Sequence, residues 1–145
     1  GRRVIAVDTN ILVYALQPGI PQHREALRRV EALATGRSPW AIPYPCVAQF
    51  LRVVTHRTFR PVIPVAAAWH NLGALLASPM VQLLTPTRQH FPLLREVIDE
   101  SGAVGDLVYD AHIVTLCLEY GVREILTADK DFRRFPGIRA TDPFR

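Results

Sequence analysis

Residues 105–132 read GDLVYDAHIVTLCLEYGVREILTADKDF, and this stretch decides the fold class. Apolar residues recur at the 3.6-residue period over Asp106–Tyr120, which predicts an amphipathic helix. Gly121 is a residue type that commonly ends helices, and the short apolar run at Glu124–Thr127 predicts a buried strand. A helix that leads directly into a buried strand is the unit from which parallel α/β sheets are built.

The rest of the chain alternates between the same two kinds of element. Short apolar runs predict strands at Arg3–Val7, Trp40–Pro43, Val81–Leu84 and Ile138–Ala140. Helical periodicity with proline or glycine at the ends predicts helices at Asn10–Leu16, His23–Ala34, Pro45–Val54, Val65–Leu76 and Phe91–Ile98, and a short one at Phe132–Phe135. This order predicts an α/β fold with a parallel sheet, formed by a single domain over residues 1–145.

Composition excludes several classes of protein. The chain is 49% hydrophobic and 21% charged, which is too apolar for a disordered chain. Cys46 and Cys117 are the only cysteines, so a disulfide framework and a four-cysteine zinc site are excluded, and we expect both thiols in the core. The apolar run Val4–Val7 is too short for a signal peptide, and no run is long enough for a membrane span. We therefore expect a cytoplasmic protein.

Charge is unevenly distributed along the sequence. The formal net charge is +4, from 17 Lys+Arg against 13 Asp+Glu, and Lys130 is the only lysine. No acidic residue lies between Glu31 and Glu96, although arginines recur throughout that stretch. Arginine binds phosphate through a planar pair of donors, so this basic middle favours a nucleic-acid partner. A GC-rich genome also raises arginine content, and the composition leaves both explanations open.

Aspartates follow the predicted strands at one edge of the sheet. Asp8 follows the first strand and Asp129 follows the fourth, with Asp131 nearby, and the carboxyl ends of parallel strands share an edge. Asp110 lies a full turn inside its helix, where capping does not explain it. Capping remains an alternative for Asp8 and for one of Asp129 and Asp131, and Asp106 at the start of its helix fits a cap or a dipole partner better than a ligand. If the carboxylates gather, they require a cation, and hard oxygen ligands suit Mg²⁺ or Mn²⁺ rather than zinc.

Taken together, these motifs resemble a known family. The quoted residues are VDTNILVYA at Val7–Ala15, IPYPCVAQFLRVVTH at Ile42–His56, GDLVYDAHIVTLCLEYGV at Gly105–Val122 and TADKDFRRFPGIR at Thr127–Arg139. They resemble the PIN domain, and most closely the VapC ribonuclease toxins of bacterial type II toxin–antitoxin pairs. The resemblance extends over essentially the whole chain and keeps the order and spacing of the motifs.

The resemblance implies a fold, an activity and a set of site residues. The fold would be a sheet of about five parallel strands flanked by helices, and the activity would be Mg²⁺- or Mn²⁺-dependent hydrolysis of RNA. Asp8 matches the first acid of the family and Asp110 the third. Asp129 matches the fourth, with Asp131 as a neighbour or substitute, and Asp106 matches an occasional extra acid.

The resemblance extends to polar residues at the edge of the site and to partners. Thr9 and Thr127 match hydroxyl positions beside the metal, and Asn10 matches an asparagine at the edge of the site. The implied partners are an antitoxin of the VapB type, which blocks the site, and a second copy of the chain in a homodimer.

One residue departs from the pattern of the family. Where the family has glutamate, this chain has Gln49, in the segment Gln49–Arg52. Glutamine keeps a carbonyl acceptor but has no negative charge and cannot act as a base. The loss should weaken metal binding, by about one to two orders of magnitude if the loss of outer-shell partners is a guide. A weakened nuclease and a PIN domain that binds RNA or a partner without cutting it both remain open.

The basic middle is a predicted RNA-binding surface. Arg52, Arg57 and Arg60 would contact phosphates, while His56 and Phe59 would offer rings for stacking. A solvated basic loop and a docking surface for an acidic partner are the alternatives. A phosphatase of the haloacid-dehalogenase type also has an aspartate after its first strand. That chemistry needs a second aspartate two residues later, where this chain has Asn10.

Overall fold

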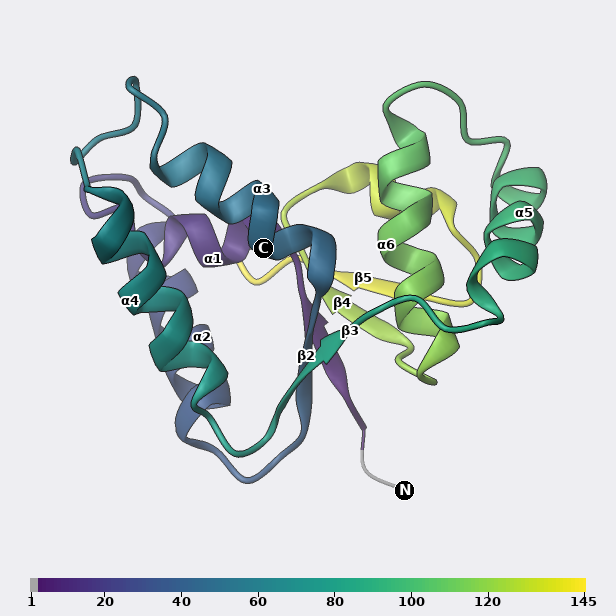
Figure 1. Cartoon of the computed structure of the whole chain (residues 1–145), viewed down its shortest axis with the longest axis horizontal. Helices are drawn as coiled ribbons and strands as arrows, with labels where there is room; N and C mark the ends of the chain where they lie inside the picture. The colour runs from purple at the N-terminus through teal and green to yellow at the C-terminus, as the bar shows by residue number, and fades with distance from the viewer. Residues whose placement is uncertain (1–2) are drawn as a thin grey trace.

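Five parallel strands form the centre of the computed structural model, which describes residues 3–145. The strands are β1 (Ile5–Val7), β2 (Trp40–Pro43), β3 (Val81–Leu84), β4 (Glu124–Leu126) and β5 (Arg139–Thr141). Their order in the sheet is β3-β2-β1-β4-β5, so the chain first builds one side from β1 and then crosses to the other (Figure 1). Every neighbouring pair is parallel, as the alternation of elements predicts.

Helices flank the sheet in two groups. The α-helices are α1 (Thr9–Tyr14), α2 (His23–Thr35), α3 (Tyr44–Val54), α4 (Val65–Leu76), α5 (His90–Ser101) and α6 (Leu107–Glu119), and a 3-10 helix η1 spans Lys130–Arg134. Helices α1 to α4 lie together on one side of the molecule, and α5 and α6 lie together on the other (Figure 1). None of the helices within residues 3–145 is long and apolar enough to cross a membrane.

The boundaries agree with the sequence-based expectations within two residues, except at the end of α5. The first strand begins at Ile5 instead of Arg3, whose exposed side chain pairs with Glu124. The fifth strand runs over Arg139–Thr141, one residue later than expected. Helix α5 is longer than predicted and ends at Gly102, where φ is +70°, a left-handed conformation that suits glycine.

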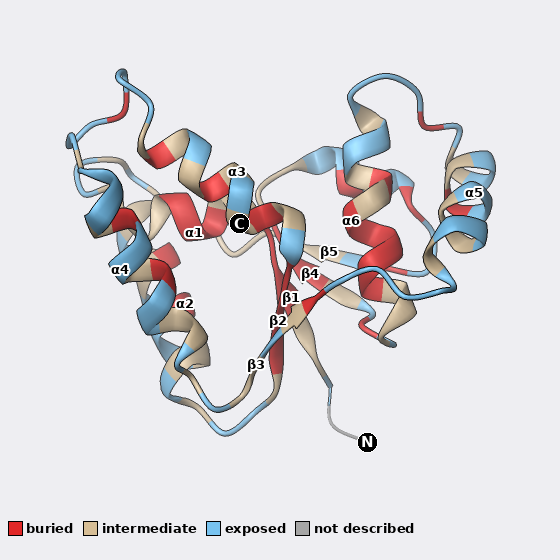
Figure 2. Cartoon of the chain, viewed as in Figure 1, coloured by how far each residue is buried: buried red, intermediate tan, exposed pale blue. Residues whose placement is uncertain are grey.

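The core lies between the sheet and the two groups of helices, where buried residues concentrate (Figure 2). All four residues of β2 are buried, including Trp40, because helices cover both faces of a parallel sheet. Helix α6 is buried along Ile113–Cys117, and its apolar centre holds the helix against the sheet. Cys46 and Cys117 are free and fully buried, as expected for core thiols. The rigid core fixes where the ends of β1, β4 and α6 meet.

Candidate metal centre

Asp8 stands at the point where β1 passes into α1. Its backbone N–H donates to the carbonyl of Leu126 at 3.0 Å, which fixes it beside the end of β4. The side chain is 5% exposed and caps α1 by accepting from the Thr9 N–H at 2.8 Å. The Thr127 hydroxyl donates to the other carboxylate oxygen at 2.7 Å. Asp8 is therefore both a helix cap and a buried carboxylate at the edge of the sheet.

Asn10 and Thr127 join the ends of β1 and β4. The Asn10 amide donates to Asp8 Oδ2 at 3.4 Å, and its carbonyl oxygen accepts from the Ala128 N–H at 3.2 Å. Thr127 Oγ1 also accepts from the Asp129 N–H at 3.0 Å. These bonds position Asp129 relative to Asp8. Asn10 and Thr127 both lie at the edge of the site, which is the position that the sequence predicts for them.

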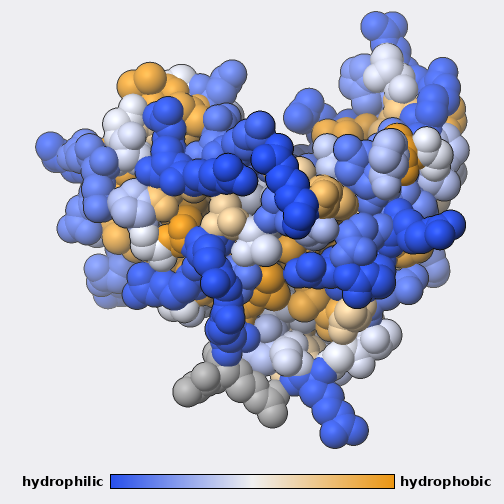
Figure 3. Space-filling view, turned by 180° about the vertical axis from the view of Figure 1, so that it is seen from behind, coloured by the Kyte–Doolittle hydropathy of each residue, from blue (hydrophilic) through white to orange (hydrophobic). Residues whose placement is uncertain are grey.

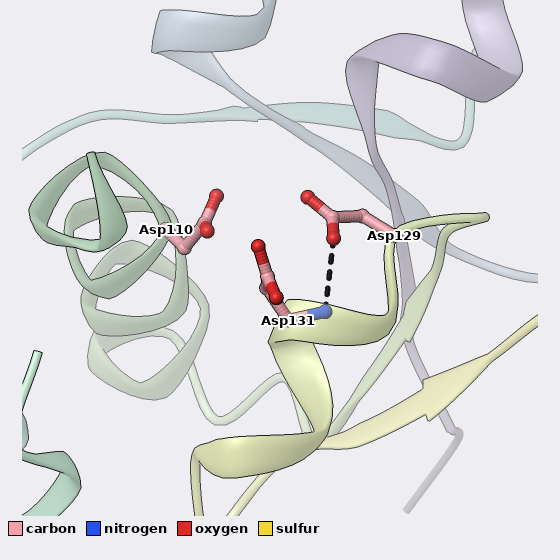
Figure 4. A group of neighbouring side chains, drawn as sticks. All are labelled: Asp110, Asp129 and Asp131. Atoms are coloured by element: carbon pink, nitrogen blue, oxygen red, sulfur yellow. Dashed lines mark hydrogen bonds between the residues drawn. The ribbon is translucent and has the colours of Figure 1, made fainter.

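Three carboxylates from different segments converge beside this edge. Asp110 comes from α6, Asp129 follows β4, and Asp131 comes from η1; all three side chains point into one space (Figure 4). Each offers an oxygen within 4.8 Å of the others. The Asp131 N–H donates to Asp129 Oδ1 at 2.9 Å, so Asp129 caps η1 as well. Asp8 and Asp106 are outside this close group.

Burial and neighbouring aspartates raise the pKa of Asp110 and of Asp8. Burial raises the pKa of Asp110 to about 7, assisted by the charges of Asp129, Asp8, Asp131 and Asp106 in that order. Burial also raises the pKa of Asp8, although the hydrogen bonds from Thr127 and Thr9 partly oppose this. Within residues 3–145, no Lys, Arg or His pairs with Asp8, Asp110, Asp129 or Asp131. Among the described residues, therefore, no side-chain cation balances the cluster.

Asp106 and Gln49 lie around the cluster in different ways. Asp106 occupies the position before α6, but its side chain makes no capping hydrogen bond, contrary to the cap interpretation, because its backbone is already helical. Gln49 reaches the cluster through Thr9, whose hydroxyl donates to Gln49 Oε1 at 2.6 Å. The Gln49 carbonyl oxygen therefore accepts from Thr9, and the side chain brings no negative charge to the cluster.

The predicted RNA-binding surface is partly revised. Arg52, Arg57 and Arg60 are exposed, at the end of α3 and in the loop after it. The Arg60 guanidinium donates to the carbonyls of Arg57 and Phe59, both at 2.9 Å, and so helps to hold the loop. The expectation that Phe59 offers a ring for stacking is wrong, because this side chain is 6% exposed and packs in the core.

Sequence comparisons assign the chain to a family. The PIN domain model matches residues 5–138. Ribonuclease VapC48 of Mycobacterium tuberculosis is 35% identical over 139 residues, which is 94% of this chain and 95% of the relative. Ribonuclease VapC33 of the same species is 33% identical over 143 residues, or 98% of this chain and 99% of the relative. The chain belongs to the PIN domain family, among the VapC ribonuclease homologues.

Solved structures agree with this fold. VapBC2 from Rickettsia felis, bound to a promoter DNA fragment, matches with a TM-score of 0.67 at 17% identity, over 95% of this chain and 97% of that one. VapC20 of Mycobacterium tuberculosis, a toxin that cleaves the sarcin-ricin loop, matches with a TM-score of 0.63 at 18% identity, over 93% of this chain and 98% of that one. At these identities the likeness concerns the fold.

Proposed function

We propose that this protein is a metal-dependent ribonuclease toxin that acts in the cytoplasm and is neutralised by a cognate antitoxin. One observation carries the proposal: in a PIN domain, Asp110, Asp129 and Asp131 converge beside buried Asp8 with no cationic side chain among residues 3–145 to balance them. An arrangement that destabilises the fold when it is ionised is typical of a functional site.

The residues present fit Mg²⁺ or Mn²⁺. All three ligand groups are carboxylates, the hard oxygen donors that these ions prefer. Two oxygens bound to one Mg²⁺ lie at most about 4.2 Å apart, given ligand bonds near 2.1 Å. The oxygens here lie within 4.8 Å of one another, so small side-chain rotations would bring them into range. Asp110, Asp129 and Asp131 would hold the ion, with Asp8 adding negative charge nearby.

Hydrolysis of an RNA phosphodiester needs an activated water and relief of charge on the phosphoryl oxygens. A bound divalent cation supplies both effects, since it lowers the pKa of water and attracts phosphate oxygens. Thr9, Thr127 and Asn10 hold the Asp8 carboxylate in one orientation through hydrogen bonds of 2.8, 2.7 and 3.4 Å. Fixed carboxylates reduce the reorganisation that would otherwise accompany the reaction.

Gln49 favours a second candidate, a PIN domain that binds RNA or a partner but cuts RNA weakly or not at all. Its Oε1 accepts from the Thr9 hydroxyl, and an amide carries no negative charge and cannot act as a base. A glutamate at this position would add a negative charge for the cation. The missing charge should reduce cation affinity about 10- to 100-fold.

The proposed partners follow from the charge pattern and from the relatives. Exposed Arg52, Arg57 and Arg60 would contact the phosphates of single-stranded or structured RNA. Solved relatives include VapBC complexes from Rickettsia felis, Haemophilus influenzae and Salmonella typhimurium, which supports a VapB-like antitoxin. A homodimer is also proposed, as for many bacterial proteins whose chains form symmetric pairs.

RNA cleavage with Mn²⁺ tests the proposal in three chains: the native sequence, Gln49→Glu and Asp8→Asn. We expect the native chain to cut RNA, Gln49→Glu to cut it about 10- to 100-fold faster at limiting metal, and Asp8→Asn to be inactive. Cutting by Gln49→Glu alone would assign the native chain to the second candidate. If neither the native chain nor Gln49→Glu cuts RNA, the nuclease proposal is wrong.

A further inference from the structure

An open hollow lies between α3 and α6, next to the aspartates. It has a volume of about 400 Å³ and is lined by Ala48, Gln49, Arg52 and Tyr109. Tyr109 directly precedes Asp110, and Gln49 is bonded to Thr9 beside Asp8, so one end of the hollow borders the acidic cluster. Seen from behind, the surface is notched between the lobe that carries α5 and α6 and the lobe that carries α3 and α4 (Figure 3).

Arg52 extends this hollow toward the basic loop, which is the loop after α3 that contains Arg57 and Arg60. The same residue lines a second open hollow of about 490 Å³, whose other walls include Tyr14, Gln17 and His56. The two hollows share Arg52 as a lining residue, so together they form a path from the acidic cluster toward His56 in the loop after α3. No acidic residue occurs between Glu31 and Glu96, so the part of this path built from α3 and its loop is positive.

Tyr109 is unusual because its ring is exposed at the entrance of this path. The side chain is 66% exposed, whereas the next part of α6 is buried from Ile113 to Cys117. Single exposed aromatic residues are common and need no function on their own. Here, however, the ring faces a hollow that holds an arginine, and both flank a site proposed to act on phosphate. An aromatic face with a nearby cation is the usual surface for an unpaired nucleobase and its phosphate.

We infer that Tyr109 and Arg52 form a nucleotide subsite for single-stranded RNA, which rests on the proposed ribonuclease function. The base next to the phosphate at the aspartates stacks on the Tyr109 ring. Arg52 binds the phosphate that follows along the strand, toward the basic loop. A base must leave its helical stack to lie on a protein ring, so the subsite selects unpaired over double-stranded RNA.

RNA binding measures this subsite without relying on cleavage. In an Asp129→Asn background, which prevents cutting, a short single-stranded RNA with one 2-aminopurine is titrated with Mg²⁺ present. Tyr109→Leu should weaken binding between about 5-fold and 150-fold, the range for loss of one stacked base, and should remove the fluorescence quenching caused by stacking. Tyr109→Phe keeps the ring and should retain both signals. The affinity for duplex RNA should hardly change.

Phe91→Leu is the matched control, because this ring is 80% exposed on α5 and lies outside the hollow. If Tyr109→Leu binds and quenches like Phe91→Leu, the subsite is wrong and the hollow is left for a protein partner. Equal losses for single-stranded and duplex RNA would also overturn it. The two proposals fail separately: a native chain that never cuts RNA, yet loses RNA affinity in Tyr109→Leu, refutes the nuclease and keeps the subsite.

Discussion

Helix α6 carries a carboxylate near each end, and their surroundings are opposite. Asp110, in the first turn, faces the other aspartates. Glu119, the last residue, has a fully buried side chain that accepts from the Thr87 N–H at 2.9 Å, the Thr87 hydroxyl at 2.6 Å and His90 Nδ1 at 2.6 Å. Thr87 and His90 supply the hydrogen bonds that Glu119 accepts, whereas no cationic side chain within residues 3–145 pairs with Asp110.

The pKa values of these two carboxylates differ accordingly. Burial raises the pKa of Asp110 to about 7, and its neighbours' charges add to the effect. Burial also raises the pKa of Glu119, but the hydrogen bonds from Thr87 and His90 outweigh this and leave it lowered. The helix dipole alone would shift both pKa values the other way, because it favours a negative charge at the N-terminal end and disfavours one at the C-terminal end. Its effect is only about 0.3–1 kcal/mol. Local partners therefore decide which carboxylate is structural and which is available for a ligand.

His112 joins the hydrogen-bonded group of Glu119 and His90, although it lies only two residues from Asp110 in the sequence. A carboxylate only accepts hydrogen bonds, so His90 Nδ1 donates to Glu119, and His90 Nε2 is hydrogen-bonded to His112 Nδ1 at 2.9 Å. His112 follows Asp110 by two residues and therefore faces α5 rather than the acids.

The largest expected effect comes from making the same chemical change at both ends of α6. Asp110→Asn should lower RNA cleavage with Mn²⁺ at least about 100-fold, since even outer-shell partners of a metal contribute about 10- to 100-fold. Glu119→Gln should leave cleavage per folded molecule unchanged. Steady-state rates and Mn²⁺ titration measure both. Equal activity of Asp110→Asn and the native chain would show that Asp110 holds no ion.

The free energy of unfolding should depend more on Glu119 than on Asp110. Glu119→Ala leaves His90 and Thr87 without their buried partner and should lower the free energy of unfolding by about 3 kcal/mol. Exposed Glu96→Ala on α5 is the control and should change it by less than about 0.5 kcal/mol. Urea denaturation measures both. A loss below about 1 kcal/mol for Glu119→Ala would mean that the hydrogen-bonded cluster is not stabilising.

The pH dependence of stability separates the regions further. The raised pKa of Asp110 means that its protonated form is favoured in the folded protein. The stability that this proton contributes is therefore complete below pH 3.8 and is lost as pH rises through about 7. An asparagine at position 110 cannot ionise, so the Asp110→Asn variant does not lose this stability at high pH. Between pH 5 and pH 8, its Tm should rise by about 3 °C relative to the Tm of the native chain, after allowance for solvent screening. Asp99→Asn, 70% exposed, should show no such gain.

Magnesium should remove most of that difference at pH 8. A cation that binds only the folded native chain stabilises it by mass action, and it requires the ionised carboxylates. At pH 5, where Asp110 holds its proton, the same Mg²⁺ concentration should have little effect on Tm. An Mg²⁺ effect that is equal at pH 5 and pH 8 would argue against binding through Asp110.

The smallest expected effect concerns the basic loop. Arg57→Ala should reduce the slope of log affinity for single-stranded RNA against log salt by about 0.7, the value for one lost phosphate contact. Arg95→Ala is the control, since Arg95 is 81% exposed but lies 3.7 Å from Asp99. Its slope should stay the same. An unchanged slope in Arg57→Ala would remove this residue from the RNA-binding surface.

Sequence patterns predict most of this fold because local periodicity and tight turns determine its elements. Helix α4 and strands β2 and β3 have the predicted boundaries, since proline and apolar runs delimit them sharply. Phe59 was misassigned because a ring between polar residues resembles a surface residue. Its burial depends on packing against distant parts of the core, which no local pattern reports.

By itself the sequence determines that aspartates follow β1 and β4 and that another lies near the start of α6, which places all of them at one edge of a parallel sheet. Only the tertiary structure decides that Asp110, Asp129 and Asp131 form the close group while Asp8 is held nearby by Thr9 and Thr127. It also decides that Glu119 is fully satisfied. The reason is that the balance between repulsion and hydrogen bonding depends on distances between segments far apart in the chain, which sequence spacing does not contain.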